Sequence, residues 1–156
     1  MAELDLFDRR ILAALQRDGR MTSVGLAEVV HLSASQCARR VQRLEEAGII
    51  RSYRAVLDPA ALGLGIAGLV NLSLEKHAKA NIQELQRQII ARSAIVECLS
   101  VTGDADYQLR IMARDLKEFS TLLMDAIVPM PGVSTMHSSI ILEEVKPLTV
   151  LPVTDD

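Results

Sequence analysis

The strongest constraint on the fold is a change in the spacing of apolar residues at Asp58-Pro59. Before this dipeptide, apolar residues recur every three or four positions, which is the spacing of one helix face. After it, from Leu64 to Leu74, large apolar residues alternate with small or polar ones, which is typical of a strand. We therefore predict an α+β chain with two small domains, residues 1–57 and 64–156, joined by a linker at residues 58–63.

The first domain shows three helical segments. The first is marked by an apolar stripe of Leu4, Phe7, Ile11 and Leu15. Thr22 caps a second segment, and Ser33-x-x-Gln36 has the form of a capping box at the start of a third. Gly48 ends the third segment, and the β-forming residues 49–57 follow it as a short ribbon. This order predicts a winged helix-turn-helix, whose last helix enters the major groove of DNA.

The second domain mixes strand and helix patterns. In chain order they fall at residues 64–74, 82–90, 95–102, 107–113, 116–127 and 133–142. The order βαββαβ predicts a ferredoxin-like fold. Helices cover only one face of such a sheet, yet the first strand is apolar or small on both faces. A domain of this size buries little core alone, so we expect the free face to pack against a second copy of the chain.

Positive charge is concentrated in one part of the sequence. The whole chain has a net charge of −3. Residues 1–60 hold nine arginines and eight acidic residues, a balance of +1, whereas residues 61–156 hold eight basic and twelve acidic residues, a balance of −4. Five arginines and two glutamates lie between Gln36 and Arg54. An acidic partner is therefore expected to bind this segment.

The third helical segment divides into two faces. On a wheel of 100° per residue with Arg39 at the origin, the polar face runs from about −60° to about 100°. The opposite face holds Cys37, Ala38, Val41 and Leu44. Guanidinium groups suit guanine or phosphate, and a glutamine amide suits adenine. The DNA-binding residues predicted in this segment are Ser33, Ser35, Gln36, Arg39, Arg40 and Arg43.

Two further arginines, Arg51 and Arg54, lie in the predicted ribbon and are candidates for phosphate contact. The alternative for all these arginines is a solvated face with ion pairs to Glu45 or Glu46. Charge alone does not decide between the two, but the helix-turn-helix spacing favours double-stranded DNA.

Other classes of protein fit the sequence poorly. The longest apolar stretch, Ala60 to Val70, has eleven residues and is too short to span a membrane, so we expect a cytoplasmic protein. Cys37 and Cys98 lack metal-ligand spacing and are expected to be small buried residues. The three histidines lie on different predicted elements, and no nucleophile–base pair is visible. We expect no enzyme activity, no cofactor and no metal site.

Short motifs along the chain form a recognisable combination. In the first domain they are Leu4-Asp5-x-x-Asp8-x-x-Ile11-Leu12, Asp18-Gly19-Arg20, Leu32-Ser33, Arg39-Arg40-Val41-x-Arg43-Leu44-Glu45 and Gly48-Ile49-Ile50. In the second they are Gly63-Leu64-Gly65, Val101-Thr102-Gly103-Asp104-x-Asp106-Tyr107, Pro131-Gly132-Val133 and Glu144-Val145-Lys146. Together they resemble the Lrp/AsnC family of leucine-responsive and asparagine regulators. The resemblance covers essentially the whole chain.

The resemblance implies a regulator that dimerises through its second domain, often assembles into octamers, and binds an amino acid at contacts between dimers. Carried over by position, the effector site would include Gly103, Asp104, Asp106, Ser138 and Ser139. A glycine-containing turn exposes N–H groups for a carboxylate, and an aspartate accepts from an ammonium group. Without the resemblance, the same loop is simply a hairpin turn.

The chain departs from the family pattern at two positions. His31 lies where the family often has glycine; histidine tolerates positive φ, so we expect an intact turn. Ala105 lies where an aromatic residue is frequent, which leaves the identity of the effector open. Three alternatives stay open: a DNA-binding regulator or architectural protein without an effector, an RNA-binding sheet, and a hard cation at Asp104 and Asp106.

Overall fold

The computed structural model describes residues 4–75, 81–147 and 150–153. The chain divides into two compact units, Met1–Val56 with Lys146–Asp156, and Leu57–Val145. This division differs from the predicted one because residues 146–156 belong to the first unit. The predicted linker counts with the second unit and contains a short 3-10 turn at Ala60–Leu62.

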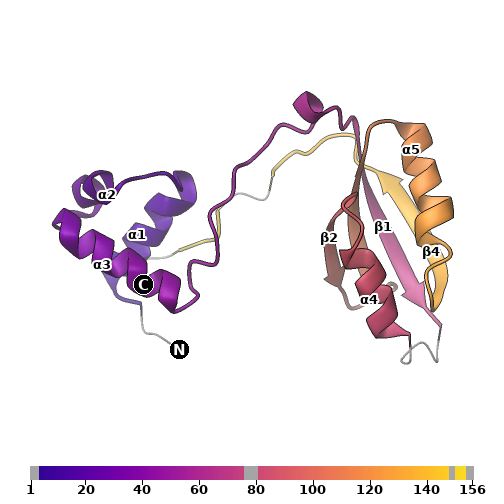
Figure 1. Cartoon of the computed structure of the whole chain (residues 1–156), viewed down its shortest axis with the longest axis horizontal. Helices are drawn as coiled ribbons and strands as arrows, with labels where there is room; N and C mark the ends of the chain where they lie inside the picture. The colour runs from indigo at the N-terminus through magenta and orange to yellow at the C-terminus, as the bar shows by residue number, and fades with distance from the viewer. Residues whose placement is uncertain (1–3, 76–80, 148–149, 154–156) are drawn as a thin grey trace. The chain divides into compact units, whose positions relative to one another are not determined.

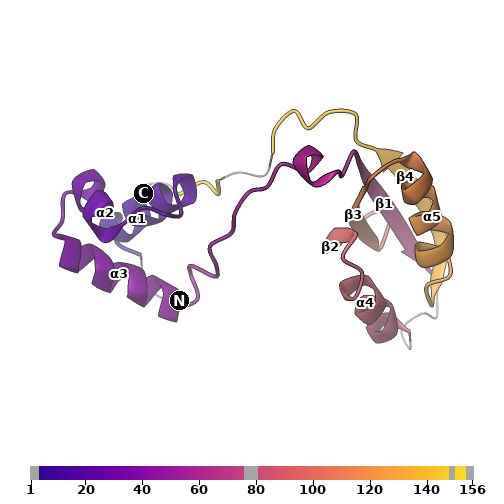
Figure 2. The same cartoon turned by 45° about the horizontal axis from the view of Figure 1, so that its top comes forward.

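Three helices form the first unit: α1 (Leu6–Arg17), α2 (Ser23–Val30) and α3 (Ala34–Glu46) (Figure 1). In Figure 2, α3 runs along one side of this unit, below α1 and α2. The apolar faces of the helices meet in a small core made of Ile11, Ala14, Leu26, Val30, Cys37 and Leu44. The helix-turn-helix predicted from the sequence is therefore formed by α2 and α3, with α1 packed on both.

Side-chain caps fix where each helix begins. Asp5 and Asp8 form a capping box at α1, and Thr22 caps α2. Ser33 and Gln36 form the predicted capping box at α3. Each cap satisfies backbone N–H groups that have no partner within the helix. The start of α3 is thus set by local sequence.

Two left-handed residues end α2 and α3. His31 has φ 58° and ψ 46°, which confirms that the turn is intact, and Gly48 has φ 68°. Beyond Gly48, residues 51–58 run as an extended chain that pairs with no strand in the described part of the protein. A run of β-forming residues needs a partner strand, and the first unit offers none, so the expected ribbon is a single extended segment.

The second unit has the predicted βαββαβ order. Its elements are β1 (Ile66–Leu74), α4 (Ile82–Ile90), β2 (Ile95–Ser100), β3 (Tyr107–Ala113), α5 (Leu116–Thr121) and β4 (Val133–Ile140). Helix α5 continues into a π-helical segment at Leu122–Ile127. The strands form one antiparallel sheet in the order β2-β3-β1-β4. This arrangement is the ferredoxin-like fold that the sequence predicts.

Helices α4 and α5 cover one face of this sheet (Figure 1). The buried core between them consists of Val70, Leu72, Leu85, Ile89, Tyr107, Leu109, Ile111, Ala113, Phe119, Leu123, Ile127 and Met130. Gly68 faces the same side, and a Cβ atom there would lie 2.4 Å from the Phe119 ring. The absence of a side chain at Gly68 therefore lets α5 approach the sheet.

Neither helix covers the other face of the sheet. The register places three cross-strand pairs on it: Ala67–Met112, Leu69–Arg110 and Asn71–Gln108. Gln108 Nε2 donates to Asn71 Oδ1 at 3.0 Å, and Arg110 forms an ion pair with Glu144 at 2.8 Å. Gln108, Asn71 and Arg110 are therefore paired, while Leu69 and Met112 add apolar surface to the same face.

The C-terminal residues return to the first unit. Leu151 N–H donates to Gln16 Oε1 at 2.6 Å, and Gln16 Nε2 donates to the Leu151 carbonyl at 3.2 Å. Pro152 and Val153 follow along a cavity of about 560 Å³ that α1 and the segment after α3 also line. The side-chain amide thus pairs with the backbone as a neighbouring strand would, which explains why residues 146–156 belong to this unit.

No helix within the described ranges is both long and apolar enough to cross a membrane. Cys37 is buried in the core of the first unit, as expected, whereas Cys98 is exposed. Cys98 lies on β2, which is an edge strand paired on one side only. The expectation that Cys98 is buried is therefore wrong.

Candidate nucleic-acid interface and effector site

The outward face of α3 is polar. Ser35, Gln36, Arg39 and Arg43 are exposed, and Arg40 is half-buried. The three arginines line a shallow hollow of about 300 Å³. Exposed guanidinium, amide and hydroxyl groups on the second helix of a helix-turn-helix are the groups that read base edges in the major groove. The structure therefore brings the predicted α3 residues onto one surface.

Two of these three arginines are held by α1. Arg40 Nη1 lies 2.7 Å from Asp5 Oδ2 and 2.7 Å from Asp8 Oδ1. Arg43 Nη2 pairs with Asp8 Oδ2. Asp8 is fully buried, and its Oδ2 also accepts from the Asp5 N–H at 3.2 Å. The ion pairs therefore join α3 to α1, and not to the glutamates of α3 that the sequence leaves as an alternative.

The ion pairs change the proton affinity of the groups involved. Burial alone raises the pKa of Asp5, but hydrogen bonds from the Asp8 N–H and from Arg40 outweigh it and hold that pKa below its ordinary value. The hydrogen bonds to Asp5 and then to Asp8 raise the pKa of Arg40. The Arg40 guanidinium also lies over the Phe7 ring, 5.5 Å from its centroid. Arg40 is therefore fixed on three sides.

The packing face of α3 lies nearer to Arg40 than the wheel predicts. Ala38, predicted to face the core, is exposed, whereas Cys37 and Leu44 are fully buried. On the wheel the two buried residues lie at about 140–160° from Arg39, next to Arg40 at about 100°. Arg40 therefore lies at the edge of the buried face, within reach of the start of α1.

The remaining predicted residues at the start of α3 and on it differ in how many of their polar groups are already hydrogen-bonded. Gln36 Oε1 accepts from the Ser33 N–H and from Ser33 Oγ, at 3.0 Å each, and Ser33 Oγ lies 3.1 Å from Ser35 Oγ. These side chains act as the cap of α3, although Gln36 keeps its amide N–H groups for another acceptor. Arg39 makes no hydrogen bond or ion pair with any other residue that the structure describes. Arg39 is thus the guanidinium most available to a ligand.

Arg51 and Arg54 lie in the extended segment after α3, and both are exposed. Between them, Tyr53 Oη donates to Glu45 Oε1 of α3 at 2.9 Å. Burial, followed by the hydrogen bond and the charge of Glu45, raises the pKa of Tyr53 to about 12. The hydrogen bond attaches the segment to α3.

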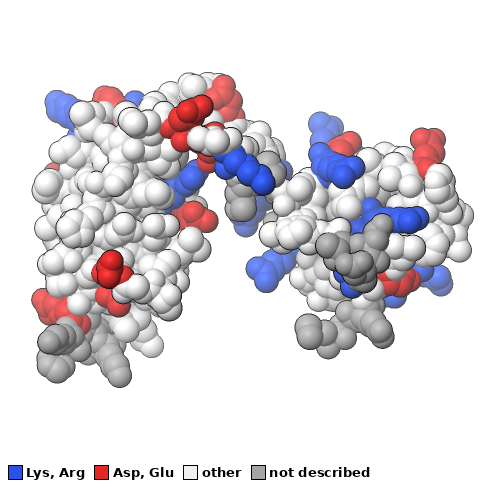
Figure 3. Space-filling model, turned by 180° about the vertical axis from the view of Figure 1, so that it is seen from behind, with Lys and Arg blue, Asp and Glu red and all other residues white. Residues whose placement is uncertain are grey.

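Figure 3 shows that Lys and Arg side chains are spread over the visible surface of the first unit, at the right.

The turn between β2 and β3 is tied to the end of β1. Asp106 N–H donates to the Leu72 carbonyl at 2.9 Å, and Leu74 N–H donates to Asp106 Oδ2 at 2.7 Å. The Asp104 carbonyl accepts from a serine hydroxyl of β1 at 3.1 Å. Gly103 has φ 116°. The N–H groups of Gly103 and Asp104 donate to no other residue in the described ranges, so they are open to an anionic ligand.

Ser138 and Ser139 do not join the turn in one chain. Ser138 lies opposite Val70 and Ser139 opposite Leu69. Successive side chains of a strand point to opposite faces, so only one of these hydroxyls can face a given pocket. Asp106 meets β1 at Leu72, about 7 Å along the strand from Val70. A site containing all five predicted effector residues therefore does not form among the described residues of a single chain.

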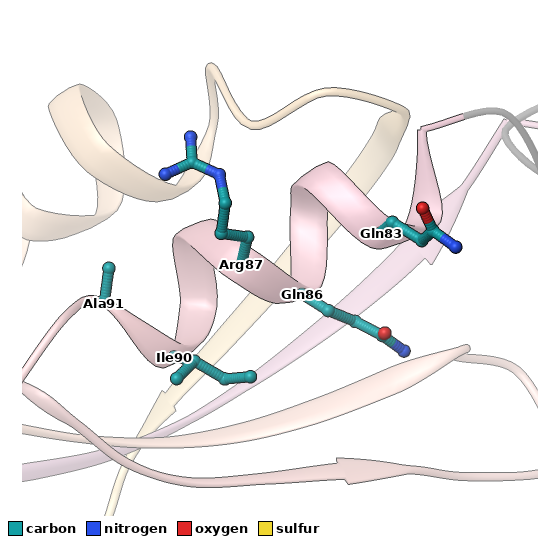
Figure 4. A pocket seen from close by; sticks show the side chains of 5 residues that line it. All are labelled: Gln83, Gln86, Arg87, Ile90 and Ala91. Atoms are coloured by element: carbon teal, nitrogen blue, oxygen red, sulfur yellow. The ribbon is translucent and has the colours of Figure 1, made fainter.

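A second hollow, of about 480 Å³, lies along α4 alone and is lined by Gln83, Gln86, Arg87, Ile90 and Ala91 (Figure 4). Figure 4 shows Arg87 and Gln86 pointing to different sides of the helix. Arg87 pairs with Glu84 at 2.6 Å, and Gln86 donates to Tyr107 Oη at 3.0 Å. The polar groups that line this hollow do not converge on one point, so we assign no ligand to it. The described residues contain no cluster of three or more His, Cys, Asp or Glu side chains suited to a metal ion.

Sequence reasoning missed Asp5, Asp8 and Gln16. The burial of Asp8 could have been predicted, because Asp8 lies three residues before Ile11 and four after Leu4, on the apolar stripe of α1. A carboxylate in such a position needs a cationic partner. The role of Gln16 could not have been predicted from its neighbours, because its partner Leu151 is 135 residues away in the sequence.

Two family models match the chain in succession. The model of a winged helix-turn-helix DNA-binding domain matches residues 4–51. The model of the Lrp/AsnC ligand binding domain matches residues 68–151.

Curated relatives match along most of their length. A leucine-responsive regulatory protein of Rhizobium meliloti is 36% identical over 144 residues, which make up 92% of this chain and 92% of the relative. A Bkd operon transcriptional regulator of Pseudomonas aeruginosa is 38% identical over 145 residues, or 93% of this chain and 95% of the relative.

Solved structures show the same fold. A transcriptional regulator from Neisseria meningitidis, solved in complex with L-Met, has a TM-score of 0.92 and 37% identity and covers 96% of this chain and 97% of its own. An AsnC family transcriptional regulator from Agrobacterium tumefaciens has a TM-score of 0.89 and 30% identity, with coverage of 96% and 97%. With a helix-turn-helix DNA-binding domain followed by a ligand-binding domain, this chain belongs to the Lrp/AsnC family of transcriptional regulators.

Proposed function

We propose that the chain binds specific sequences of double-stranded DNA through α3, and that an amino acid bound near the β2–β3 turn modulates this binding. The observation that carries the proposal is the polar face of α3, held in a fixed orientation by its capping box and by two ion pairs to α1. Rigid placement of donors is a condition for reading base edges.

The residues proposed to contact DNA are Ser33, Ser35, Gln36, Arg39, Arg40, Arg43, Arg51 and Arg54. The exposed arginines after α3 suit phosphate, since the structure gives them no partner among the described residues. Phosphate contacts position the protein, and side chains in the groove provide the specificity.

The proposed effector is an amino acid, which needs donors for its carboxylate and an acceptor for its ammonium group. The open N–H groups of Gly103 and Asp104 and the carboxylate of Asp104 supply both at the β2–β3 turn. The complex of the related Neisseria regulator with L-Met supports this ligand class. Because Ser138 and Ser139 lie away from the turn in one chain, their participation requires a second copy.

The uncovered face of the sheet is the proposed dimer contact. Gln108 is already paired with Asn71 and Arg110 with Glu144, which lowers the cost of covering these groups, and Leu69 and Met112 supply apolar surface. Such dimers are expected to assemble further, up to octamers. Leu69→Asp is expected to dissociate the assembly in light scattering, whereas Leu116→Asp, at an exposed position on α5, leaves it unchanged.

DNA binding is tested by enriching a randomised duplex pool on the full chain and measuring the affinity of the enriched duplex in a gel-shift assay. Arg39→Ala is expected to weaken binding at least about tenfold without changing the oligomer. The logarithm of affinity should fall with the logarithm of salt concentration at a slope of about −0.9 per phosphate contact. A wild-type chain that shows no salt-dependent affinity for any duplex would refute the proposal.

Effector binding is tested by calorimetry with each of the twenty common amino acids, beginning with L-methionine. Asp104→Asn is expected to weaken the response without altering affinity for DNA measured in the absence of an effector. A parallel titration with Ca²⁺ or Mg²⁺ separates an amino-acid site from a cation site. DNA binding without any amino-acid response would leave a regulator or architectural protein without an effector.

RNA binding by the sheet is not favoured. The two aromatic residues available to it, Tyr107 and Phe119, are only 7% and 3% exposed and lie in the core beneath the helices. Stacking of bases needs aromatic rings on an open sheet face.

A further inference from the structure

We propose that Asp8 of α1 determines base specificity, by holding Arg40 and Arg43 away from the bases so that Arg39 is the arginine that reads them. This inference rests on the proposed function, since it assumes that α3 enters the major groove. It assigns a role to a residue that lies outside the helix-turn-helix itself.

Asp8 is buried although it carries a charge. Asp8 is the one charged residue that is fully buried among those the structure describes. Oδ1 accepts from Arg40 and Oδ2 from Arg43, so each carboxylate oxygen is used by a different guanidinium. A carboxylate buried without cationic partners is strongly destabilising, so both ion pairs are expected to persist when the protein binds DNA.

The contacts of Arg40 restrict how it can approach a base. Reading guanine requires two N–H groups on one edge of a guanidinium. Arg40 Nη1 is shared between Asp5 and Asp8, and one flat side of the group lies over the Phe7 ring. The Arg40 side chain keeps only 23% of its surface exposed. It is therefore poorly placed for a bidentate contact with a base.

Arg43 and Arg39 differ in how many of their donors are already used. Arg43 keeps 57% of its side-chain surface exposed, but one terminal nitrogen is committed to Asp8. It can reach a phosphate while it stays paired. Arg39 makes no hydrogen bond or ion pair within the described part of the chain, so its whole fork of donors is available. Two carboxylates also neutralise the charges of Arg40 and Arg43, which leaves Arg39 as the uncompensated cation of the three.

A structural role and a specificity role predict different effects of Asp8→Asn. If Asp8 only stabilises the fold, the variant binds all duplexes more weakly and prefers the same sequence. If Asp8 restrains the arginines, the variant frees them, and new guanine preferences arise at base positions beside the one that Arg39 reads. Asparagine keeps the volume of aspartate and one acceptor oxygen, so the core is disturbed as little as possible.

The experiment enriches a randomised duplex pool on four full-length proteins: wild type, Asp8→Asn, Asp5→Asn and Arg39→Ala. The Arg39→Ala variant is expected to lose at least about tenfold discrimination at one base position. The Asp8→Asn variant is expected to keep that position and to gain a preference at an adjacent one. Identical wild-type and Asp8→Asn motifs, or unchanged discrimination in Arg39→Ala, would overturn the inference.

Asp5→Asn is the matched control, because it removes a carboxylate beside Arg40 while Asp8 still holds Arg40 and Arg43, so the wild-type motif is expected. Asp5 is half-exposed and pairs with Arg40 alone among the arginines of α3. Its substitution therefore leaves no unpaired charge in the core. Melting curves of each protein establish which variants are folded. If Asp8→Asn unfolds, Arg43→Ala replaces it, because Asp8 still pairs with Arg40 in that variant: an unchanged motif supports the inference, and a lost base preference overturns it. A wild-type protein that enriches no motif instead refutes the proposed function.

Discussion

Gly68 of β1 and Phe119 of α5 are in such close contact that a methyl group on residue 68 would lie 2.4 Å from the phenyl ring. Phe119 is 3% exposed and belongs to the buried core of the second unit. Gly68→Ala is therefore expected to lower the free energy of unfolding by about 1–3 kcal/mol through overpacking. Urea denaturation measures the change.

The double variant Gly68→Ala/Phe119→Leu checks the cause. Because leucine removes the ring edge, the alanine should cost less free energy in that background than in the wild type. Equal costs in the two backgrounds would show that the contact is not responsible.

Arg40→Ala should destabilise the first unit, because it leaves Asp8 buried with one guanidinium instead of two. The expected loss is about 3 kcal/mol, measured by thermal or chemical denaturation. Arg39→Ala is the matched control, since it removes an exposed arginine of the same helix and should change stability by less than about 0.5 kcal/mol. Equal effects of the two substitutions would contradict the assignment of Arg40 to the fold.

Tyr53 should stay protonated well above the usual pH for a tyrosine. Its pKa is raised to about 12 by burial and by Glu45. A raised folded-state pKa stabilises the protein below the ordinary tyrosine value, and that contribution disappears as pH rises through about 12. Absorbance titration of a Tyr107→Phe background isolates this group. Glu45→Gln should lower the titration midpoint of Tyr53, because it removes the charge of Glu45. An unchanged midpoint would mean that burial alone raises the pKa of Tyr53.

Gln16→Ala should release the C-terminal residues from the first unit. The substitution removes both hydrogen bonds to Leu151, each worth about 1 kcal/mol at most in net stability. The Leu151 amide is expected to be protected from hydrogen exchange in the wild type and unprotected in the variant. Gln42→Ala, which removes a hydrogen bond within α3, should leave that protection intact.

Local signals in the sequence accounted for most of the fold. The period of the apolar residues located both domains, and the capping box at Ser33 fixed the start of α3. The turn at His31 could be predicted because its conformation depends on that residue and its neighbours. Each of these features is determined over a few residues, which is the range that periodicity and capping rules describe.

The features that escaped prediction depend on residues distant in the sequence. The extended segment after Gly48 has a strand composition but no strand to pair with. The wheel placed Arg40 on the polar face, yet the packing of α1 brings Asp8 to it from 32 residues away. The predicted exposure of Arg39 and Gln36 agrees with the structure, because both residues lie inside the polar face of the wheel and not at its edge.

The contact between Gln16 and Leu151 has a consequence for biosynthesis. The ribosome makes Gln16 135 residues before Leu151, so α1, α2 and α3 emerge long before their last tertiary partner exists. During that interval the side of α1 that carries Gln16 lacks this partner, and the entire sheet domain must be made before Leu151 can bind there. A stop codon shortly before Leu151 would therefore remove a tertiary partner of α1, although it leaves the sequence of all three helices unchanged.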